Sequence, residues 1–521
     1  MRSISVNVKG LSCFFDKGII DNDLMARTTM KEKIHGGKNN GRFREVEYDV
    51  PIYQRAPNNK LVCGLGAILY LAKNNPFVEL QFSSMNPSRE VLGPIVIPEG
   101  ILNSSKWKVN GKERWYFHEA LEACRKAHCG TVRLATGSGK TSIELTLAYN
   151  QMRQLGSGII LVPNHTIKDQ FIKSANAFGI PMVDYREWVY DISALDNNIV
   201  ISTPKVVHND IENIENWVRH QTTEDWRPVL QKLHTLSWII GDEVHHAGTD
   251  TWNKIFLNLP NLSRSHGFSA LPVSEETNSI NFSGMSLEDA LTVSIVGPVI
   301  YERSTRELKE FLNIPYLINL HYSWPKNKWA DQSTDNWNKI RGVCKINIER
   351  TKFIADAMRL LILNGYNTIA HVGDKTFGIM LLEEIGLQEC VCWYGGGEVI
   401  TLSGSKISSE DLRKKVGTSI FGMICTSHAI EGLDLESPLD ALMLIDGKKA
   451  RPVIQKSGRI VRPSDRKSLI INLIDSNIWV LPGHGKQRTG VITDEFDCEI
   501  LDIFSIKALE KLLKRLGRFE T

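Results

Sequence analysis

The sequence contains no run of about 18 apolar residues, the length that a membrane-spanning helix needs, and no signal-peptide pattern at its N-terminus. Hydrophobic residues make up 42% of the chain and charged residues 23%, proportions that are ordinary for a globular protein. We therefore expect a soluble, cytoplasmic protein.

A C-x-x-C pair is also absent, although the chain has nine cysteines. The nearest approaches to metal-ligand spacing are Cys390 with Cys392, and Cys124 with His128 and Cys129. Because no second ligand pair stands at a suitable spacing, we expect reduced, partly buried thiols rather than a metal site.

The chain is neither strongly charged nor repetitive. Its net charge is only +3, so a nucleic-acid surface would have to be a local patch. No internal repeat or low-complexity segment is present. At 521 residues the chain is long for one domain, and at roughly 150 residues a domain it predicts two to four.

Four regions differ in their residue pattern. Residues 1–108 mix short strand-like runs with turn-rich joints, which predicts a small α+β accessory domain. Residues 109–325 and 326–488 each alternate strand-like and helical segments, which predicts two α/β domains with parallel sheets. Residues 489–521 are expected to be a C-terminal extension.

The extension contains a basic amphipathic helix. Its apolar face is marked by Ile506, Leu509, Leu512, Leu513 and Leu516. We expect this face to pack on the preceding domain; DNA and another subunit are the alternatives.

The segment RLATGSGKTS at 133–142 has the composition of a phosphate-binding loop. Phosphate oxygens need converging N–H donors and a cation, which a glycine-rich turn and a helix N-terminus supply. The residues before it predict a strand, and those after it predict a helix that ends near Gly156. Lys140 would reach the β- and γ-phosphates, and the Thr141 hydroxyl would bind Mg²⁺. The remaining loop residues are Thr136, Gly137, Ser138 and Gly139.

A strand-like run ending in two carboxylates follows about 100 residues later, in LSWIIGDEVHHAG. Asp242 could hold Mg²⁺, and Glu243 could polarise the water that attacks ATP. Such a pair in the same α/β domain as a phosphate loop predicts an ATP-hydrolysing site.

With His245, these residues spell D-E-V-H, and here the chain resembles the superfamily 2 helicases and translocases. Further segments stand in that family's order. They are LVPNHTIKDQF (161–171), ISTPKVV (201–207), GFSALP (267–272), TIAHVGDK (368–375), TSHAIEGLDL (426–435) and QKSGRIVR (455–462). The resemblance implies two tandem RecA-like domains with ATP bound between them.

The resemblance also implies residue roles. Arg459 and Arg462 would neutralise the γ-phosphate in the transition state, and Gln455 would sense it. Gly432 and Asp434 would face the nucleotide. His245 and Ser269 would couple hydrolysis to strand movement, and the strand itself would be contacted by Pro163, Thr203 and Thr426.

Two departures from the family pattern stand out. The family often has a Tyr-Gln pair that reads adenine, whereas this chain has Tyr116 followed by Phe117. One of these rings could still stack on the base. The family's Ser-Ala-Thr reads Ser269-Ala270-Leu271 here, which removes one hydroxyl.

The N-terminal region suggests the substrate. Residues 26–44 carry six Lys or Arg against one Glu, as a basic loop that tracks phosphates would, although a solvated loop without a partner is the alternative. The candidate DNA contacts are Lys31, Lys33, Lys38, Arg42 and Arg44. A small domain ahead of two motor domains resembles UvsW-like phage branch-migration helicases and XPB-like and RecG-like remodelers.

We therefore expect a DNA helicase that depends on ATP and Mg²⁺ and remodels forked or branched DNA in replication, recombination or repair. We expect it to act as a monomer. Its location would be the cytoplasm, or the host cytoplasm if it is phage-encoded. Three alternatives remain: the motor subunit of a restriction or repair complex, an RNA helicase, and an ATP-switched DNA-binding protein.

Overall fold

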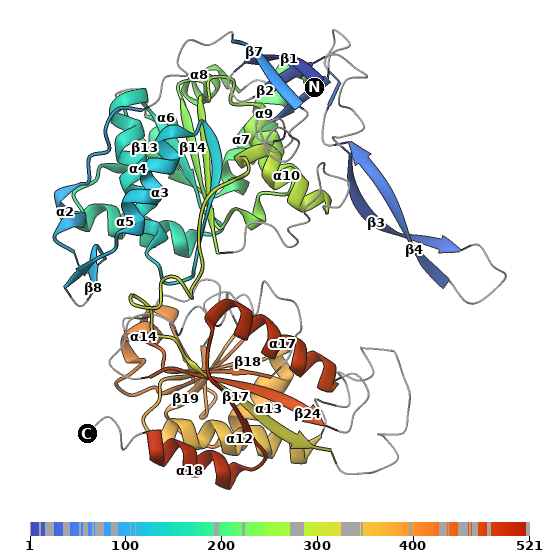
Figure 1. Ribbon diagram of the computed structural model, residues 1–521, viewed down its shortest axis with the longest axis vertical. Coiled ribbons are helices and arrows are strands. Elements are labelled where there is room, and N and C mark those ends of the chain that lie inside the picture. The colour runs from blue at the N-terminus through green and yellow to red at the C-terminus, as the bar shows by residue number, and fades with distance from the viewer. Residues whose placement is uncertain are drawn as a thin grey trace. The chain divides into compact units, whose positions relative to one another are not determined.

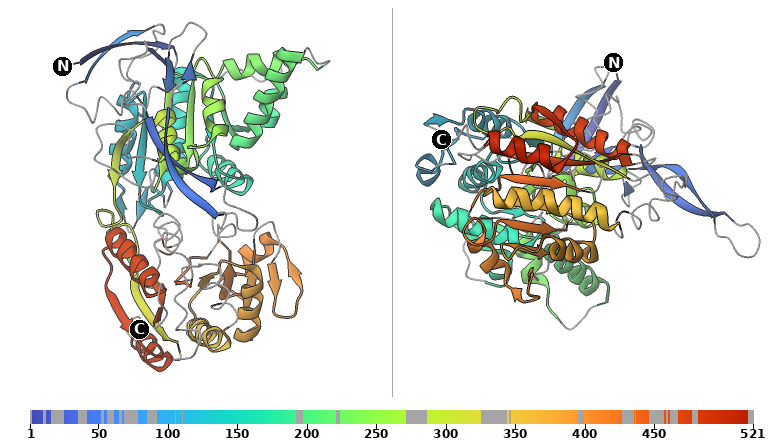
Figure 2. Two further views of the ribbon diagram at one scale, coloured as in Figure 1. Left: turned by 90° about the vertical axis from the view of Figure 1, so that its right-hand side faces the viewer. Right: turned by 90° about the horizontal axis from the view of Figure 1, so that it is seen from below.

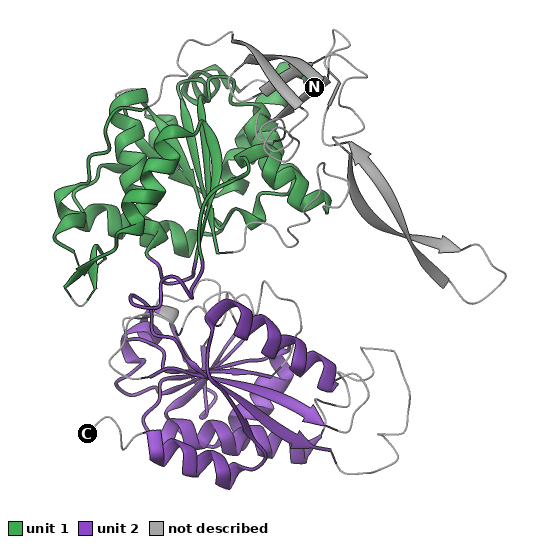
Figure 3. Cartoon of the chain, viewed as in Figure 1, with its two compact units in different colours: residues 1–134, 139–303 green, residues 135–138, 304–521 purple. Residues whose placement is uncertain are grey.

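The computed structural model describes residues 92–191, 197–220, 224–270, 286–324, 347–394, 399–426, 437–445, 467–476 and 481–516, apart from 105 and 110, and a few single positions between these ranges. Between residues 2 and 84 it describes the backbone of the strands and the position of Ala67. The chain divides into two compact units, residues 1–134 with 139–303, and residues 135–138 with 304–521 (Figure 3).

The N-terminal region is built of strands, as its alternating β-branched and polar residues predict. Five of them form a sheet in the order β5-β6-β2-β1-β7, in which β1 and β7 are parallel and the other pairs antiparallel. These strands are β1 (Arg2–Lys9), β2 (Ser12–Phe15), β5 (Gln54–Arg55), β6 (Leu61–Gly64) and β7 (Val78–Ser84).

The two longest N-terminal strands, β3 (Met25–Ile34) and β4 (Arg42–Pro51), pair with each other as a separate antiparallel ribbon. Their register sets several opposite charges across from one another, with Lys31 opposite Glu45 and Glu32 opposite Arg44. Opposite charges at facing positions stabilise a two-stranded pair.

The first unit contains a seven-stranded parallel sheet in the order β12-β13-β11-β14-β15-β10-β16 (Figure 1). Its strands are short and rich in Ile and Val, as expected where both faces of a parallel sheet are covered by helices. They are β10 (Cys129–Leu134), β11 (Gly158–Leu161), β12 (Met182–Asp184), β13 (Ile199–Ser202), β14 (Trp238–Asp242), β15 (Arg264–Ser269) and β16 (Val299–Arg303).

Helices cover both faces of this sheet. The central helix α4 (Lys140–Leu155) packs against β14, β11 and β13 and against α3 (Tyr116–Lys126). The other face buries an apolar core that includes Ile159, Trp188 and Trp252. The remaining elements of the unit are α2 (Glu99–Leu102), β8 (Lys108–Val109), β9 (Lys112–Glu113), α5 (His165–Ala177), α6 (Tyr185–Tyr190), α7 (Pro204–His220), α8 (Arg227–His234), the 3₁₀ turn η2 (Val244–His246), α9 (Asp250–Leu257) and α10 (Leu287–Val296).

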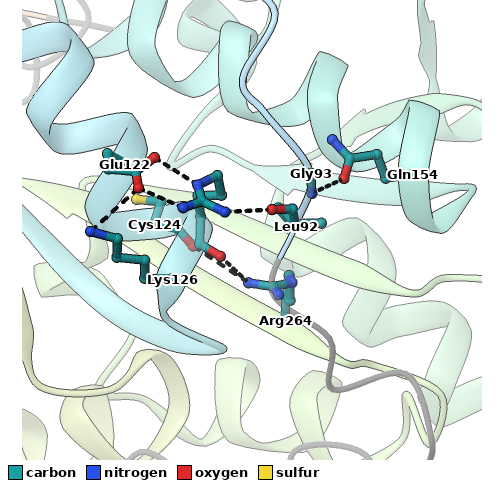
Figure 4. A network of polar contacts seen from close by, with 8 residues as sticks. Leu92, Gly93, Glu122, Cys124, Lys126, Gln154 and Arg264 are labelled. Carbon is teal, nitrogen blue, oxygen red and sulfur yellow. Dashed lines mark hydrogen bonds and ion pairs between the residues drawn. The ribbon is translucent and has the colours of Figure 1, made fainter.

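A polar network attaches the segment before α2 to this unit (Figure 4). Arg125 at the end of α3 donates to the Leu92 carbonyl at 2.8 Å, and the Gly93 N–H donates to Gln154 of α4 at 2.6 Å. Arg125 also forms an ion pair with Glu122 and lowers the pKa of that exposed carboxyl to about 2. Beneath them, the buried Arg264 donates to three carbonyls at the end of α3, the shortest of these bonds being 2.7 Å to Ala127.

The second unit contains a nine-stranded sheet in the order β21-β20-β19-β22-β18-β23-β24-β17-β25, parallel except at β20 and β21. Its strands are β17 (Tyr316–Ser323), β18 (Thr368–His371), β19 (Cys390–Trp393), β20 (Val399–Thr401), β21 (Lys406–Ile407), β22 (Gly422–Cys425), β23 (Ala441–Leu444), β24 (Leu469–Ser476) and β25 (Ile500–Ile503).

Helices again lie on both faces of the sheet (Figure 2). One apolar core joins the sheet to α12 (Ile348–Leu363), α13 (Lys375–Ile385) and α18 (Ile506–Leu516), and a second core joins it to α14 (Ser409–Lys415) and α17 (Leu481–Phe496). Helix α18 buries Leu509, Leu512 and Leu513. The expected packing of this helix on its own domain is confirmed.

The domain limits differ from those expected at two places. The second unit begins at Ser304 rather than at 326, because β17 pairs with β24 and β25 of the second sheet. Residues 489–521 are not a separate extension, because they supply the end of α17, the edge strand β25 and helix α18. Among the described residues, no helix is both long and apolar enough to cross a membrane.

The second unit also contains a buried ion pair whose loss should be costly. Arg350 donates two hydrogen bonds to Asp475, at 2.7 and 2.9 Å, and the Trp324 indole N–H donates a third at 3.0 Å. Replacing Asp475→Asn leaves the Arg350 charge buried without a counter-ion, so we expect the free energy of unfolding to fall by about 3–5 kcal/mol.

Chemical denaturation of the two proteins measures this difference. Lys414→Ala is the matched control, because it removes an exposed ion pair with Glu410 and should cost no more than about 1 kcal/mol. Equal losses from the two changes would contradict the assignment of the buried pair as a stabilising contact.

Candidate nucleotide-binding site

The glycine-rich loop lies between β10 and α4, as the sequence predicts. Gly137 and Gly139 have φ angles of +81° and +86°, a left-handed backbone that glycine adopts without strain. Helix α4 begins at Lys140, so its first N–H groups face the loop. The Lys140 ammonium donates to the Leu134 carbonyl at 3.3 Å and thereby lies across the loop.

The loop is packed against the start of α3. A Cβ atom on Gly139 would lie 2.6 Å from Nη1 of Arg114 and 2.9 Å from Cζ of Phe117. Both of these side chains are buried. Position 139 therefore requires glycine for two reasons, its backbone angle and the lack of space for a side chain.

Tyr116 does not occupy the place that we expected beside a nucleotide base. Its side chain is fully buried, and burial raises its pKa to about 12 against the opposing effect of Arg114. The reason is its position in the first turn of α3, where it points into the core with Phe117. Neither ring offers an exposed face for stacking.

The two carboxylates of the D-E-V-H sequence, Asp242 and Glu243, stand at the carboxyl end of β14. Strand β15 lies between β14 and β10, the strand that precedes the loop. Asp242 is buried, and one of its oxygens accepts the Glu243 backbone N–H at 2.9 Å. Glu243 has φ +48° and ψ +50°, a left-handed conformation that is uncommon outside glycine and often marks a functional position.

Hydrogen bonds hold the Glu243 side chain in this conformation. Ser269, the last residue of β15, donates to its Oε2 at 3.3 Å, and His245 Nδ1 lies 3.3 Å from the same oxygen. The His245 ring also lies 3.1 Å from the Ser269 hydroxyl. The structure thus brings together the three residues to which the sequence assigned water activation and coupling.

A third acidic residue, which the sequence analysis did not single out, lies near Asp242 and Glu243. Glu144 follows Lys140 by one turn of α4 and is completely buried. Burial, reinforced by the charges of Asp242 and Glu243 and opposed by Lys140, raises the pKa of Glu144 well above its usual value. The available signal was the run of apolar residues Ile143, Leu145, Leu147 and Ala148, which occupies more than one face of α4 around this position.

The candidate nucleic-acid contacts fall into two groups. Pro163 and Thr203 follow the neighbouring strands β11 and β13 at the same edge of the first sheet, but Thr203 is 5% exposed. Thr426 follows β22 of the second sheet, and its hydroxyl donates to the Tyr394 carbonyl at 3.1 Å. Lys31, Lys33, Arg42 and Arg44 lie on the ribbon β3–β4, where only the backbone is described.

Some predicted residues lie outside the described part of the chain. They are Lys38, Leu271, Gly432, Asp434, Gln455, Arg459 and Arg462. The remaining loop residues, Thr136, Ser138 and Thr141, are described and lie where the sequence places them, with Ser138 buried.

The chain is similar to known proteins in part of its sequence and in its fold. Residues 104–274 match the family model "Type III restriction enzyme, res subunit". A curated relative, "Putative helicase 22" of Sulfolobus islandicus filamentous virus, is 21% identical over 361 residues, which are 66% of this chain and 60% of the relative. The chain thus spans less than two thirds of that relative's length.

Two solved structures share the fold. S. cerevisiae Dbp5 bound to RNA and ADP BeF3 has a TM-score of 0.53 at 13% identity, covering 81% of this chain and 96% of its own. The DUF1998 helicase MrfA bound to DNA and AMPPNP has a TM-score of 0.51 at 15% identity, covering 81% of this chain and 56% of its own. The two tandem RecA-like domains inferred from the motifs are therefore confirmed.

The buried Glu144 leads to a prediction about pH. Because its pKa is raised in the folded state, the folded protein binds a proton that the unfolded chain releases above the usual carboxyl pKa near 4.5. The contribution of Glu144 to stability is therefore fully present below the unfolded-state pKa near 4.5. It is lost as the pH rises from there toward the higher pKa of Glu144 in the folded state. Glu144→Gln should raise the free energy of unfolding at pH 7 more than at pH 4.

Denaturation of wild type and variant at both pH values tests this. Glu187→Gln is the control, because Glu187 lies in α6 of the same unit but is exposed. A gain from Glu144→Gln that is the same at both pH values would show that Glu144 does not titrate with a raised pKa.

Proposed function

We propose that this superfamily 2 helicase uses ATP hydrolysis to move along DNA and to remodel forked or branched DNA, by unwinding, fork reversal or branch migration, in replication, recombination or repair. The proposal covers the activity and the substrate; it is supported by the two RecA-like domains and by the family match of residues 104–274.

The observation that carries the proposal is the hydrogen-bonded group of Glu243, His245 and Ser269. A carboxylate at the end of β14, beside a phosphate loop, is positioned to polarise a water molecule for attack on ATP. The hydrogen bond from Ser269 joins the Glu243 carboxylate to the end of the neighbouring strand β15. A displacement of Glu243 when the γ-phosphate is cleaved would therefore also move Ser269 and the residues after it. This coupling supports a motor rather than a static binding protein.

The donors present fit Mg²⁺. The Thr141 hydroxyl at the start of α4 and the Asp242 carboxylate at the end of β14 are hard oxygen ligands, and α4 packs directly on β14. When bound, Mg²⁺ would neutralise charge on the phosphates. Lys140 would bind the phosphates, and Arg459 and Arg462, supplied by the second domain, would stabilise the transition state in this proposal.

DNA is proposed over RNA because of the part that precedes the first motor domain. A β-sheet and a separate two-stranded ribbon precede residue 92, and a small domain in this place resembles the arrangement in UvsW-like, XPB-like and RecG-like DNA remodelers. A two-stranded ribbon also has a width that the major groove of DNA accepts. Dbp5, bound to RNA, shares the fold, so RNA must be tested directly.

A second candidate function is the motor subunit of a restriction complex. The match of residues 104–274 to the res subunit of type III restriction enzymes favours it. In that case a partner protein would cut the DNA, and ATP turnover would depend on that partner.

The proposal is tested by ATP turnover of the purified protein with no nucleic acid, single-stranded DNA, duplex, a model fork, a four-way junction and RNA. We expect the largest stimulation from forked or branched DNA. Stimulation by RNA alone would make it an RNA helicase, and no stimulation by any of these would favour the restriction subunit. Glu243→Gln should lower stimulated turnover by about 100-fold or more while ATP remains bound.

Ser269→Ala tests the coupling role separately from hydrolysis. Without its hydroxyl the Glu243 side chain loses a bond to β15, so we expect ATP turnover to stay within about threefold and base pairs unwound per ATP to fall by about tenfold. Ser265→Ala, on the same strand, is the control, because its buried hydroxyl lies at the other end of β15. Equal effects from the two serines would refute the coupling role.

A further inference from the structure

The last strand of the second sheet leaves one of its edges open. β25 pairs with residues 317–320 of β17, and among the described strands none pairs with its other edge. The Leu317 N–H donates to the Glu499 carbonyl at 2.9 Å, so the backbone of residue 499 faces β17. Because the direction of the backbone groups alternates along a strand, those of Ile500 and Asp502 face the open edge.

Two apolar side chains stand exposed beside this edge. Ile500 is 40% exposed and Phe504 is 71% exposed, the largest fraction for any large apolar side chain among the described residues. Side chains alternate in direction along a strand, so these two share one face with Asp502, whereas Leu501 and Ile503 pack on the core beneath. Exposed apolar side chains at an open strand edge favour pairing with another chain.

Neighbouring side chains hold Phe504 and Asp502 in place. His321 of β17 stacks on the Phe504 ring, with 4.4 Å between the ring centroids and 18° between the planes. Oδ1 of Asp502 lies 2.9 Å from Nε2 of His321 and accepts a hydrogen bond from Asn319 at 3.2 Å. The hydrogen bond with His321 holds the pKa of Asp502 below its usual value, so this carboxylate is ionised at neutral pH. The edge therefore presents a negative charge between two apolar side chains.

The charge around the edge decides which kind of chain can pair with it. Residues 494–504 include five acidic residues and no Lys, Arg or His. Arg306 of the same unit forms an ion pair with one of the five, Asp497, at 3.3 Å. Nucleic acid is disfavoured at this edge, because its phosphates have the same sign of charge.

A second copy of the chain is disfavoured for a related reason. Antiparallel pairing of two β25 strands over residues 500–504 would set Asp502 of each copy opposite Asp502 of the other. Like charges at directly facing positions destabilise a strand pair. The complementary chain is one that carries a basic residue at that position.

We propose that the open edge of β25 binds an extended segment of a partner protein, which adds a strand to the sheet and places a basic residue opposite Asp502. Apolar residues of the segment lie opposite Ile500 and Phe504, so the partner reads apolar, basic, apolar at every second position. In this mode of recognition, backbone hydrogen bonds supply affinity and the alternate side chains supply selectivity. The inference is independent of the nucleotide site and of the nucleic acid on which the motor acts.

The test is equilibrium binding of two fluorescent probe peptides to the full chain. One has the central sequence Val-Thr-Lys-Thr-Val, and the other has glutamate in place of lysine. We expect wild type to bind the lysine peptide about tenfold more tightly, because Asp502 attracts lysine and repels glutamate. Methylation of the backbone nitrogen of the central lysine should abolish binding, because it removes a hydrogen bond to the strand edge and obstructs its close approach.

Variants of the chain locate the binding surface. Asp502→Lys should reverse the preference, so that the glutamate peptide binds about tenfold more tightly than the lysine peptide. Phe504→Ala should weaken binding of the lysine peptide by about tenfold. Glu410→Lys is the matched control, because it reverses the charge of a side chain on α14 that is 75% exposed, and it should change neither affinity.

The other outcomes would overturn the proposal. Equal binding of both peptides by wild type, or no binding of either at about 1 mM, would show that the edge does not select a basic strand. Displacement of the lysine peptide by duplex DNA would assign the surface to nucleic acid. Sedimentation that shows a dimer in wild type but not in Phe504→Ala would assign it to a second copy. The peptide measurements on wild type decide the question even if Asp502→Lys is unstable.

Discussion

The first RecA-like domain depends on the left-handed backbone at Gly139. Only glycine adopts that conformation without strain, and the absence of a side chain lets Arg114 and Phe117 lie against the loop. Helix α3, the loop and α4 are thereby fixed as one block. Since α4 starts immediately after this glycine, its N–H groups and Lys140 are held in place before any ligand is bound, which lowers the entropic cost of binding phosphate.

A similar conformation recurs at Glu243, where the residue is not glycine and the backbone is less favourable. Here the compensation comes from Ser269 and His245, which bond the side chain. The two unusual backbone positions thus lie in the segments that follow β10 and β14, where nucleotide chemistry is expected. Both orient groups toward the edge at which parallel strands end.

Much of the fold could be predicted from local pattern. The strand before the loop, the helix after it and the strand ending in Asp242 are where their hydrophobic periodicity indicated. The error at β17 has a physical cause. Its residues favour a strand, but the sheet that it joins is decided by pairing with β24, about 150 residues away, which no local signal reports.

The candidate site shows the same limit. Lys140, Asp242 and Glu243 could be proposed from the sequence because their chemistry needs fixed spacing within short motifs. Tyr116 and Trp115 are adjacent aromatic residues, and the sequence does not say which one the helix start turns inward. Glu144 escaped notice because acidic residues in helices are usually exposed, whereas α4 is enclosed.

The pairing of β17 with β25 affects synthesis of the chain on the ribosome. The first sheet is complete once β16, ending at Arg303, has emerged, and domains generally fold N-terminal first during synthesis. The second sheet starts with β17 but cannot close its edge until β25 and α18 are available, near residue 516. For about 150 residues of elongation, until β24 is available, β17 has no partner on either side, so this stretch is the period in which the nascent protein is most exposed to aggregation or to chaperone binding.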